Sequence, residues 1–141
     1  MHPLAALALV VALVALATGA GLAWRAGQGR VRRTRPDAVA IEGVELAPAA
    51  TLVQFSSEYC TPCRATARVL HEVADASPGV VHVELDVAER PELTARFGIL
   101  QTPTTLVLDG DGRVRARIGG AVRRDTVTAE LAHLLGTPAT V

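Results

Sequence analysis

The longest stretch without a charged side chain, Leu4 to Trp24, limits where the N-terminal part of this chain can lie. Its 21 residues would form about 31 Å of α-helix, which is close to the hydrocarbon thickness of a bilayer. Trp24 stands where an interfacial aromatic residue is typical, and five arginines follow between positions 25 and 35. The sequence therefore predicts one membrane-spanning helix within residues 1–24.

A cleaved signal peptide is the alternative interpretation, with Ala15-Leu16-Ala17 as its cleavage site. Two features oppose it: no basic residue precedes the apolar run, and the arginines behind it resist translocation. Because arginine-rich flanks stay in the cytoplasm, we expect a single-pass protein of the cell membrane whose C-terminal part lies in the cytosol. A reversed topology or a cleaved leader would make that part extracytoplasmic.

The charges divide the chain into a basic and an acidic part. The formal net charge is zero, but residues 36–141 carry nine arginines and all fourteen acidic residues, a balance of −5. Nucleic-acid binding is not expected, because an acidic domain repels the phosphate backbone.

Pro36 and Pro48 interrupt a linker with a short strand predicted near 39–44. The predicted division is a membrane helix in 1–24, a basic flank and linker in 25–50, a domain in 51–136, and a C-terminal tail in 137–141.

After the linker, hydrophobic periodicity and turn residues predict alternating strands and helices. Short alternating runs indicate strands, apolar spacings of three and four indicate helices, and Gly110-Asp111-Gly112 is typical of a hairpin turn. The predicted elements are a strand at 51–55, a helix at 61–76, a strand at 80–86, a helix at 91–98, strands at 104–109 and 113–118, and a helix at 123–135. Ala65, Val69, Leu70 and Val73 share one face of the 61–76 helix. The order β-α-β-α-β-β-α predicts an α/β fold with a mixed sheet and helices on both faces.

The only two cysteines, Cys60 and Cys63, are separated by two residues at the start of the 61–76 helix. A structural zinc site needs four ligands, and no second Cys or His motif completes one. The histidines have no mutual ligand spacing, and each is expected on the surface or on a helix face: His2, His71, His82 and His133. A copper(I) site of the C-x-x-C kind, or two inert buried thiols, are the alternatives to a redox pair.

The position of the cysteine pair favours redox chemistry. A cysteine at a helix N-terminus has its thiolate stabilised by free backbone N–H groups and by the positive end of the helix dipole. Cys60 is predicted at that place, and Cys63, one turn further, is close enough to attack a mixed disulfide formed at Cys60. Pro62 suits the first turn, where its missing N–H removes a donor that would lack a partner.

The domain resembles the thioredoxin family from about Thr51 to Leu135. FSSEYCTPCR resembles the active-site segment of the family, in which Trp-Cys-Gly-Pro-Cys is usual. RFGILQTPTTLVLDGDGRV resembles the segment in which a cis-proline precedes a central strand, and ARIGG resembles the glycine turn before the last helix. Pro103 follows Cys63 by 40 residues, a spacing typical of the family. The resemblance implies the thioredoxin fold and thiol-disulfide oxidoreductase activity.

The resemblance also implies roles for the matching residues. Cys60 would be the exposed nucleophile and Cys63 the resolving thiol. Pro103 would be cis and face the disulfide, so that the backbone of Thr102 pairs with an extended protein substrate in a groove kept open by the Gly119-Gly120 turn. The implied substrate-binding residues are Tyr59, Thr61, Pro62, Thr102, Pro103 and Gly119.

Three residues depart from the family pattern. Tyr59 replaces the usual Trp and keeps an aromatic ring with a polar tip. Thr61 replaces Gly between the cysteines, at a dipeptide that affects the redox potential. Gln54 stands where the family commonly has a buried Asp that takes the proton of the resolving thiol, and an amide takes no proton. Glu84 or Asp86 on the neighbouring strand is the predicted substitute, and resolution is expected to be slower or more dependent on alkaline pH.

Together these observations predict a membrane-anchored thiol-disulfide oxidoreductase that exchanges disulfides with protein partners. No organic cofactor or metal is expected, because the cysteine pair itself carries the electrons. In the cytosol the protein would reduce its partners, and an upstream reductase, which the sequence does not identify, would restore the dithiol. Outside the cytosol it would be a thiol reductase of the cytochrome-maturation or envelope type. A third hypothesis is a redox-inactive binding module that keeps only the peptide groove.

Overall fold

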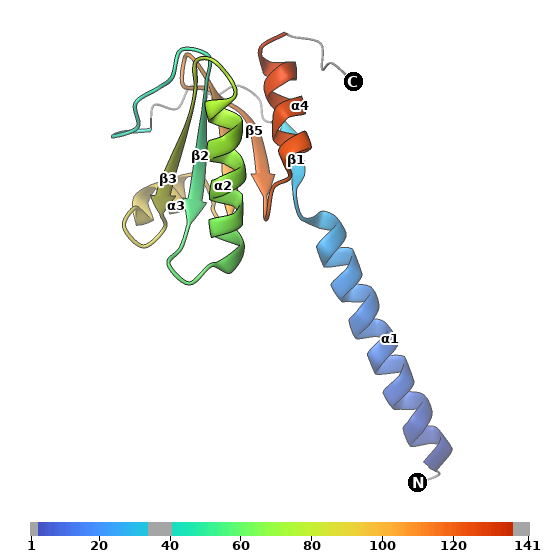
Figure 1. The fold of residues 1–141 in the computed structure, drawn as a ribbon. Helices are drawn as coiled ribbons and strands as arrows, with labels where there is room; N and C mark the ends of the chain where they lie inside the picture. Colours follow the sequence, from blue (N-terminus) through green and yellow to red (C-terminus); the bar gives the residue numbers. More distant parts are fainter. Residues whose placement is uncertain (1–2, 34–40, 137–141) are drawn as a thin grey trace.

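The computed structural model describes residues 3–33 and 41–136 as one long helix followed by a mixed α/β domain (Figure 1). In chain order the elements are α1 (Pro3–Gly27), β1 (Arg30–Arg33), β2 (Ala50–Ser56), α2 (Thr61–Asp75), β3 (Val80–Asp86), α3 (Pro91–Arg96), β4 (Thr104–Asp109), β5 (Val114–Gly119) and α4 (Arg124–Leu134). The predicted order from β2 to α4 is confirmed, with element ends that differ from the prediction by one or two residues.

Two predictions for the linker region are corrected. Arg30–Arg33 forms β1, which the sequence did not predict because a single apolar residue among three arginines carries no strand periodicity. The strand expected near 39–44 falls partly outside the described residues. Its described part, 41–44, is a turn in which the Val44 N–H donates to the Ile41 carbonyl at 3.1 Å.

The five strands form one sheet in the order β1-β5-β4-β2-β3. β2 and β3 pair in parallel, whereas β2–β4, β4–β5 and β5–β1 are antiparallel. The parallel pair needs a long crossover, which α2 supplies, and the hairpin between β4 and β5 needs only the short turn at 110–112. The predicted mixed sheet is confirmed.

Helices α2 and α4 cover one face of the sheet and bury its larger apolar cluster. Leu70 and Val73 of α2 and Val127 and Leu131 of α4 contact the strands there. The sheet side chains in this cluster are Ala50, Leu52, Val80, Val107, Ala116 and Ile118. Each of these four helix residues is at most 3% exposed, so burial of apolar area fixes both helices on this face.

The opposite face is covered by α3 and by the segment that precedes β2. Leu93 of α3 and Ile41 pack on a second cluster. The other buried members of this cluster are Val53, Phe55, Ile99, Leu106, Leu108 and Val114. The rings of Phe55 and Phe97 lie 6.0 Å apart between their centroids. Helices on both faces of the sheet are thereby confirmed.

The predicted buried face of α2 is confirmed for Leu70 and Val73 and is wrong for Ala65. Ala65 is exposed and Val69 is half-buried. The residues that face the sheet are Cys63, Thr66, Leu70, Val73 and Ala74. The prediction did not include Cys63 and Thr66. These two residues lie three positions apart on the buried face and extend it to the first turn of the helix.

The N-terminal helix joins the sheet directly through β1. Arg30 to Arg33 pair with Gly119 to Ala116 of β5, and Val31 packs at the edge of the α2/α4 cluster. The guanidinium of Arg33 donates to both carboxylate oxygens of Glu130 on α4, at 3.5 and 3.4 Å. Every side chain of α1 is exposed, and its 25 residues are long and apolar enough to cross a membrane, a property that signal sequences share.

Replacing Arg33 with Ala should lower the free energy of unfolding by about 1–3 kcal/mol, because the buried Glu130 carboxylate loses its partner. Glu130 keeps only 5% of its side-chain surface exposed. The measurement is urea unfolding of the full chain in a non-ionic detergent, followed by circular dichroism.

The control is Arg123→Ala, which removes an ion pair with Asp125 in which both side chains are largely exposed. That variant should stay within about 0.5 kcal/mol of wild type. Equal losses in the two variants would contradict a specific contribution from Arg33.

Candidate active site

The two cysteines lie where β2 passes into α2. β2 ends at Ser56, and a turn follows in which the Cys60 N–H donates to the Ser57 carbonyl at 3.1 Å. Cys60 is the N-cap of α2, with extended backbone angles of φ −87° and ψ 97°, and Pro62 occupies the first turn. Proline is tolerated in that turn because the first N–H groups of a helix have no intrahelical partner. The predicted helix start is confirmed.

Cys60 and Cys63 form a disulfide with a Cα–Cα distance of 5.3 Å. The two sulfur positions differ in access, because Cys63 is only 1% exposed and Cys60 is half-buried. Tyr59 is 90% exposed beside them, and Thr61 and Pro62 are exposed as well. Only the first cysteine of the pair therefore lies at the surface, among residues that a partner can contact.

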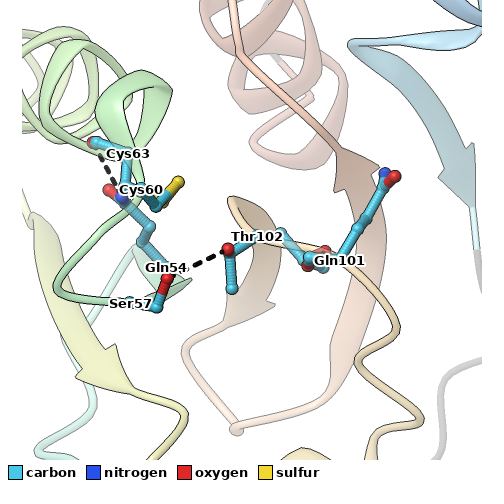
Figure 2. Close-up of a disulfide and its surroundings, with 7 residues drawn as sticks. Gln54, Ser57, Cys60, Cys63, Gln101 and Thr102 are labelled. Carbon is cyan, nitrogen blue, oxygen red and sulfur yellow. Dashed lines mark hydrogen bonds between the residues drawn. A yellow bond between two sulfur atoms is a disulfide. The ribbon is translucent and has the colours of Figure 1, made fainter.

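A second loop packs against this one and contains a cis peptide bond between Thr102 and Pro103. The cis isomer implied by the family resemblance is thus confirmed. The hydroxyl groups of Ser57 and Thr102 lie 3.4 Å apart and join the two loops. Figure 2 shows Thr102 turned toward the disulfide loop and Gln101 turned away from it. The structure therefore brings together residues that stand about forty positions apart in the chain.

The glycine turn after β5 supports the cis-proline loop. The Gly120 N–H donates to the Pro103 carbonyl at 2.8 Å, and Gly120 has a φ of +84°. The side chain of Gln101 lies over Gly119, where a Cβ would come within 2.6 Å of its Nε2 atom. A Cβ on Gly120 would collide with the side chain of Gln28, which belongs to the segment between α1 and β1. The segment that follows the N-terminal helix thus packs on the turn that holds Pro103.

Gln54 lies fully buried beneath the disulfide. Its Nε2 donates to the Cys63 carbonyl oxygen at 3.0 Å, and its Oε1 lies 3.2 Å from Nε2 of His82 on β3 (Figure 2 shows the first of these bonds). With the amide in this orientation, Nε2 of His82 is the donor. The sequence predicted Glu84 or Asp86 as the substitute proton acceptor. Glu84 pairs in register with Gln54 but is exposed, and Asp86 accepts a hydrogen bond from the Ala88 N–H.

The position of His82 corrects the expectation of a surface or helix-face histidine. His82 is half-buried on a strand, and burial lowers its pKa, an effect that the nearby Glu84 carboxylate partly offsets and the nearby His71 imidazole reinforces. The imidazole is therefore held neutral. Side chains alternate between the two faces of a strand, so the pattern VVHVELD could have separated His82 from the face that Val81 and Val83 share.

Two buried hydroxyls lie in the same layer. Thr66 follows Cys63 by one turn on α2, and Thr105 pairs with Gln54 across β4 and β2. Neither Oγ1 atom has a hydrogen-bond partner within the part of the chain that the structure describes. The polar layer under the disulfide consequently consists of neutral groups: an amide, two hydroxyls and an imidazole. Sequence reasoning missed both threonines, because a threonine inside an apolar run gives no separate signal.

A disulfide at the first turn of a helix, with a cis-proline loop packed against it on a mixed sheet, defines a thiol-disulfide oxidoreductase. A sequence model of the family described as thioredoxin matches residues 42–133. Thioredoxin from Alicyclobacillus acidocaldarius is 40% identical over 85 residues, which span 60% of this chain and 80% of that protein. The chain belongs to the thioredoxin family.

Solved structures agree with this assignment. The crystal structure of chloroplastic thioredoxin z is 26% identical, with a TM-score of 0.57 over 63% of this chain and 80% of that one. A mutant thioredoxin from Halobacterium salinarum NRC-1 is 20% identical, with a TM-score of 0.56 over 62% of this chain and 75% of that one. The second likeness concerns the fold alone.

The free energy of unfolding should fall as the pH drops below about 6.5, because His82 takes up a proton more readily in the unfolded chain than in the fold. Because the pKa of His82 is lowered in the fold, its full contribution to the free energy of unfolding is present above about pH 6.5. This contribution is lost as the pH falls from that value toward the pKa of His82 in the folded state. Replacement of His82 with Gln keeps a donor for Gln54 and should remove this part of the pH dependence.

The measurement is urea unfolding of the full chain in non-ionic detergent at about pH 7.5 and 5.5. His133→Gln is the matched control, because His133 is exposed on α4. If the two variants lose the same amount of stability between these pH values, His82 is not the group responsible.

Proposed function

We propose that this protein is a membrane-anchored thioredoxin that reduces disulfides in protein partners, with Cys60 as nucleophile and Cys63 as resolving thiol. The single observation that carries the assignment is the unequal access to the two sulfurs. Cys60 caps α2 at the surface, whereas Cys63 is 1% exposed inside the first turn. A partner sulfur can reach Cys60 only. Because Cys60 precedes the helix, its thiolate is stabilised by the free N–H groups of that turn.

The reaction conserves atoms and electrons in two exchanges. The Cys60 thiolate attacks a partner disulfide, a bond forms between Cys60 and one partner sulfur, and the other partner sulfur leaves and takes a proton. Cys63 then loses its proton and attacks the Cys60 sulfur, which releases the second partner thiol and closes the disulfide present in the structure. Two electrons and two protons pass to the partner, and a dithiol reductant returns them to the protein.

The partner segment would lie between the two loops at the active-site end of the sheet. We assign its binding to the exposed Tyr59, Thr61 and Pro62 on one side, and to Thr102 and Pro103 on the other. The Ser57–Thr102 contact holds these two sides together. Gly119 supports the groove indirectly, because the Gln101 side chain lies over it. In this arrangement the backbone of Thr102 is the part that pairs with an extended segment.

Among the described residues, no carboxylate hydrogen-bonds to Gln54 or to Cys63, in contrast to the usual family pattern of a buried acid. Gln54 binds the Cys63 carbonyl, and its neighbour His82 donates to it. Neither contact accepts a thiol proton, so resolution depends on hydroxide or another base from solution. The second exchange is therefore expected to accelerate with rising pH.

Helix α1 would anchor the domain in the cell membrane, as its length and composition suggest. Within this proposal, residues 51–136 are the catalytic domain, residues 25–50 the basic flank and linker that includes β1, and residues 137–141 the tail. The arginines that follow α1 favour a cytosolic domain. That compartment keeps thiols reduced, so the dithiol form would act as a reductant.

The roles of the two cysteines can be separated by substitution. Cys60→Ser should abolish reduction of insulin, whereas Cys63→Ser should attack once and accumulate a mixed disulfide, with turnover reduced by at least about a hundredfold. The measurements are insulin reduction with dithiothreitol and mass spectrometry of the trapped adduct. Turnover of insulin by Cys60→Ser would contradict the roles assigned to the two cysteines. If the wild-type protein reduces no disulfide, the hypothesis of a redox-inactive binding module is favoured instead.

The side of the membrane is tested with the Cys63→Ser variant, which keeps one surface thiol. A membrane-impermeant maleimide should label Cys60 in inverted vesicles and not in intact cells, because the arginine-rich flank retains the domain in the cytosol. Lysed cells supply the control for full labelling. Labelling of intact cells would place the domain outside and favour an envelope thiol reductase, and release of the protein by carbonate would indicate a cleaved leader.

A further inference from the structure

The strand register connects the active site to the end of α1. Phe55 pairs with Thr104, Thr104 with Gly119, and Gly119 with Arg30, so these four residues form one row across the sheet. At the usual spacing of about 4.8 Å between strands, three steps separate β2, just before the disulfide loop, from β1. Figure 1 shows α1 extending away from the same end of the sheet at which α2 begins. The N-terminal helix therefore leaves the domain at the end of the sheet that carries the active site, three strands away from β2.

A cavity of about 670 Å³ lies along this row, between the end of α1 and the cis-proline loop. It extends from Trp24 and Gly27 to Thr104 and Gly119. The larger side chains that line it are Trp24, Arg30, Arg32, Leu100, Gln101 and Arg117. Three of them are arginines, and none of the described residues that line the cavity carries a carboxylate.

Side chains of β1 alternate between the two faces of the sheet, so its arginines lie on different sides. Val31 and Arg33 face the α2/α4 side, where Arg33 binds Glu130. Arg30 and Arg32 therefore point to the other side of the sheet, and both are exposed. Arg32 pairs in register with Arg117 of β5, and like charges directly opposite each other across a strand pair repel. An anionic group in the cavity would relieve this repulsion.

Arg117, which lines the cavity, is held in place by two hydrogen bonds. Its guanidinium donates to the carbonyl oxygens of Phe97 and Gly98, at 2.7 and 2.8 Å. Partial burial and then the charge of Arg32 lower its pKa, although a guanidinium stays charged near neutral pH. The cavity thus holds one ordered positive charge and two exposed ones from the strand that continues α1.

We propose that this cavity, defined by Arg30, Arg32, Arg117 and Trp24, binds an acidic segment that flanks the disulfide of the partner protein. The inference rests on the proposed function and adds the class of partner to it. Because α1 supplies Trp24 and leads directly into β1, the anchor forms part of the substrate site. The partner's disulfide would consequently lie close to the membrane surface from which α1 emerges.

Continuity with the cis-proline loop favours a protein segment over a lipid headgroup. Gln101 and Thr104, which flank Thr102 and Pro103 in the chain, line the cavity, so the cavity borders the loop to which we assign the partner segment. Leu100 is 95% exposed and offers an apolar contact to such a chain. A phosphate headgroup would use the arginines and would leave this part of the cavity without a role.

The test compares matched disulfide-bridged peptides whose flanks are Glu, Gln or Lys, reduced by the full chain in phosphatidylcholine nanodiscs. Wild type should reduce the Glu peptide with a kcat/KM about tenfold above the Gln peptide, and added salt should diminish this ratio. The Arg30→Gln/Arg32→Gln variant should bring the ratio close to one. Arg30→Glu/Arg32→Glu should reverse the preference in favour of the Lys peptide, a gain that misfolding cannot produce.

The control is Arg113→Gln/Arg123→Gln, which removes two exposed charges outside the cavity and should keep the wild-type ratio. A wild-type protein that reduces all peptides equally overturns this proposal and leaves the proposed function intact. Failure to reduce any peptide overturns the proposed function itself. If phosphatidylglycerol in the nanodisc abolishes the preference for Glu, headgroups occupy the cavity and the proposal is wrong.

Discussion

The lateral pairing of β2, β4, β5 and β1 is the constraint on which the rest of this thioredoxin depends. Antiparallel pairing of β2 with β4 sets Phe55 beside Thr104, and thereby brings the start of α2 next to the cis peptide bond at Pro103. Pairing of β5 with β1 extends the same row to Arg30. Because hydrogen-bonded register admits no gradual slip, the disulfide, the cis-proline loop and the end of α1 are held in one fixed arrangement.

Within that arrangement, the two cysteines lie one helical turn apart and therefore have different surroundings. Cys60 caps α2 at the surface, whereas Cys63 enters a layer that contains the amide of Gln54 and the hydroxyls of Thr66 and Thr105. A hydrogen-bonded neutral group is buried at lower cost than a carboxylate. Gln54 is hydrogen-bonded through both ends of its amide, whereas the two hydroxyls have no partner among the described residues. The exchange of the family's buried acid for an amide therefore suits the burial of this layer but removes a proton acceptor.

The arginines of β1 lie on two different sides of the sheet. Arg33 binds the buried Glu130 and fixes β1 to α4, while Arg30 and Arg32 point to the opposite side of the sheet. The arginines that follow a long apolar helix are usually regarded as a charged flank, yet here they complete the edge of the sheet. Helix α1 and the active site are consequently connected through one sheet.

The sequence by itself determined the features whose causes are local: the apolar length of α1, the helix start at Cys60 with Pro62 in its first turn, and the order of strands and helices. The cis isomer at Pro103 followed from a motif that resembles one family. Tertiary structure alone decided the pairing of β1 with β5, the bond between residues 97 positions apart at Arg33 and Glu130, and the contact of His82 with Gln54. These depend on which surfaces meet after folding, and no periodicity of a single segment contains that information.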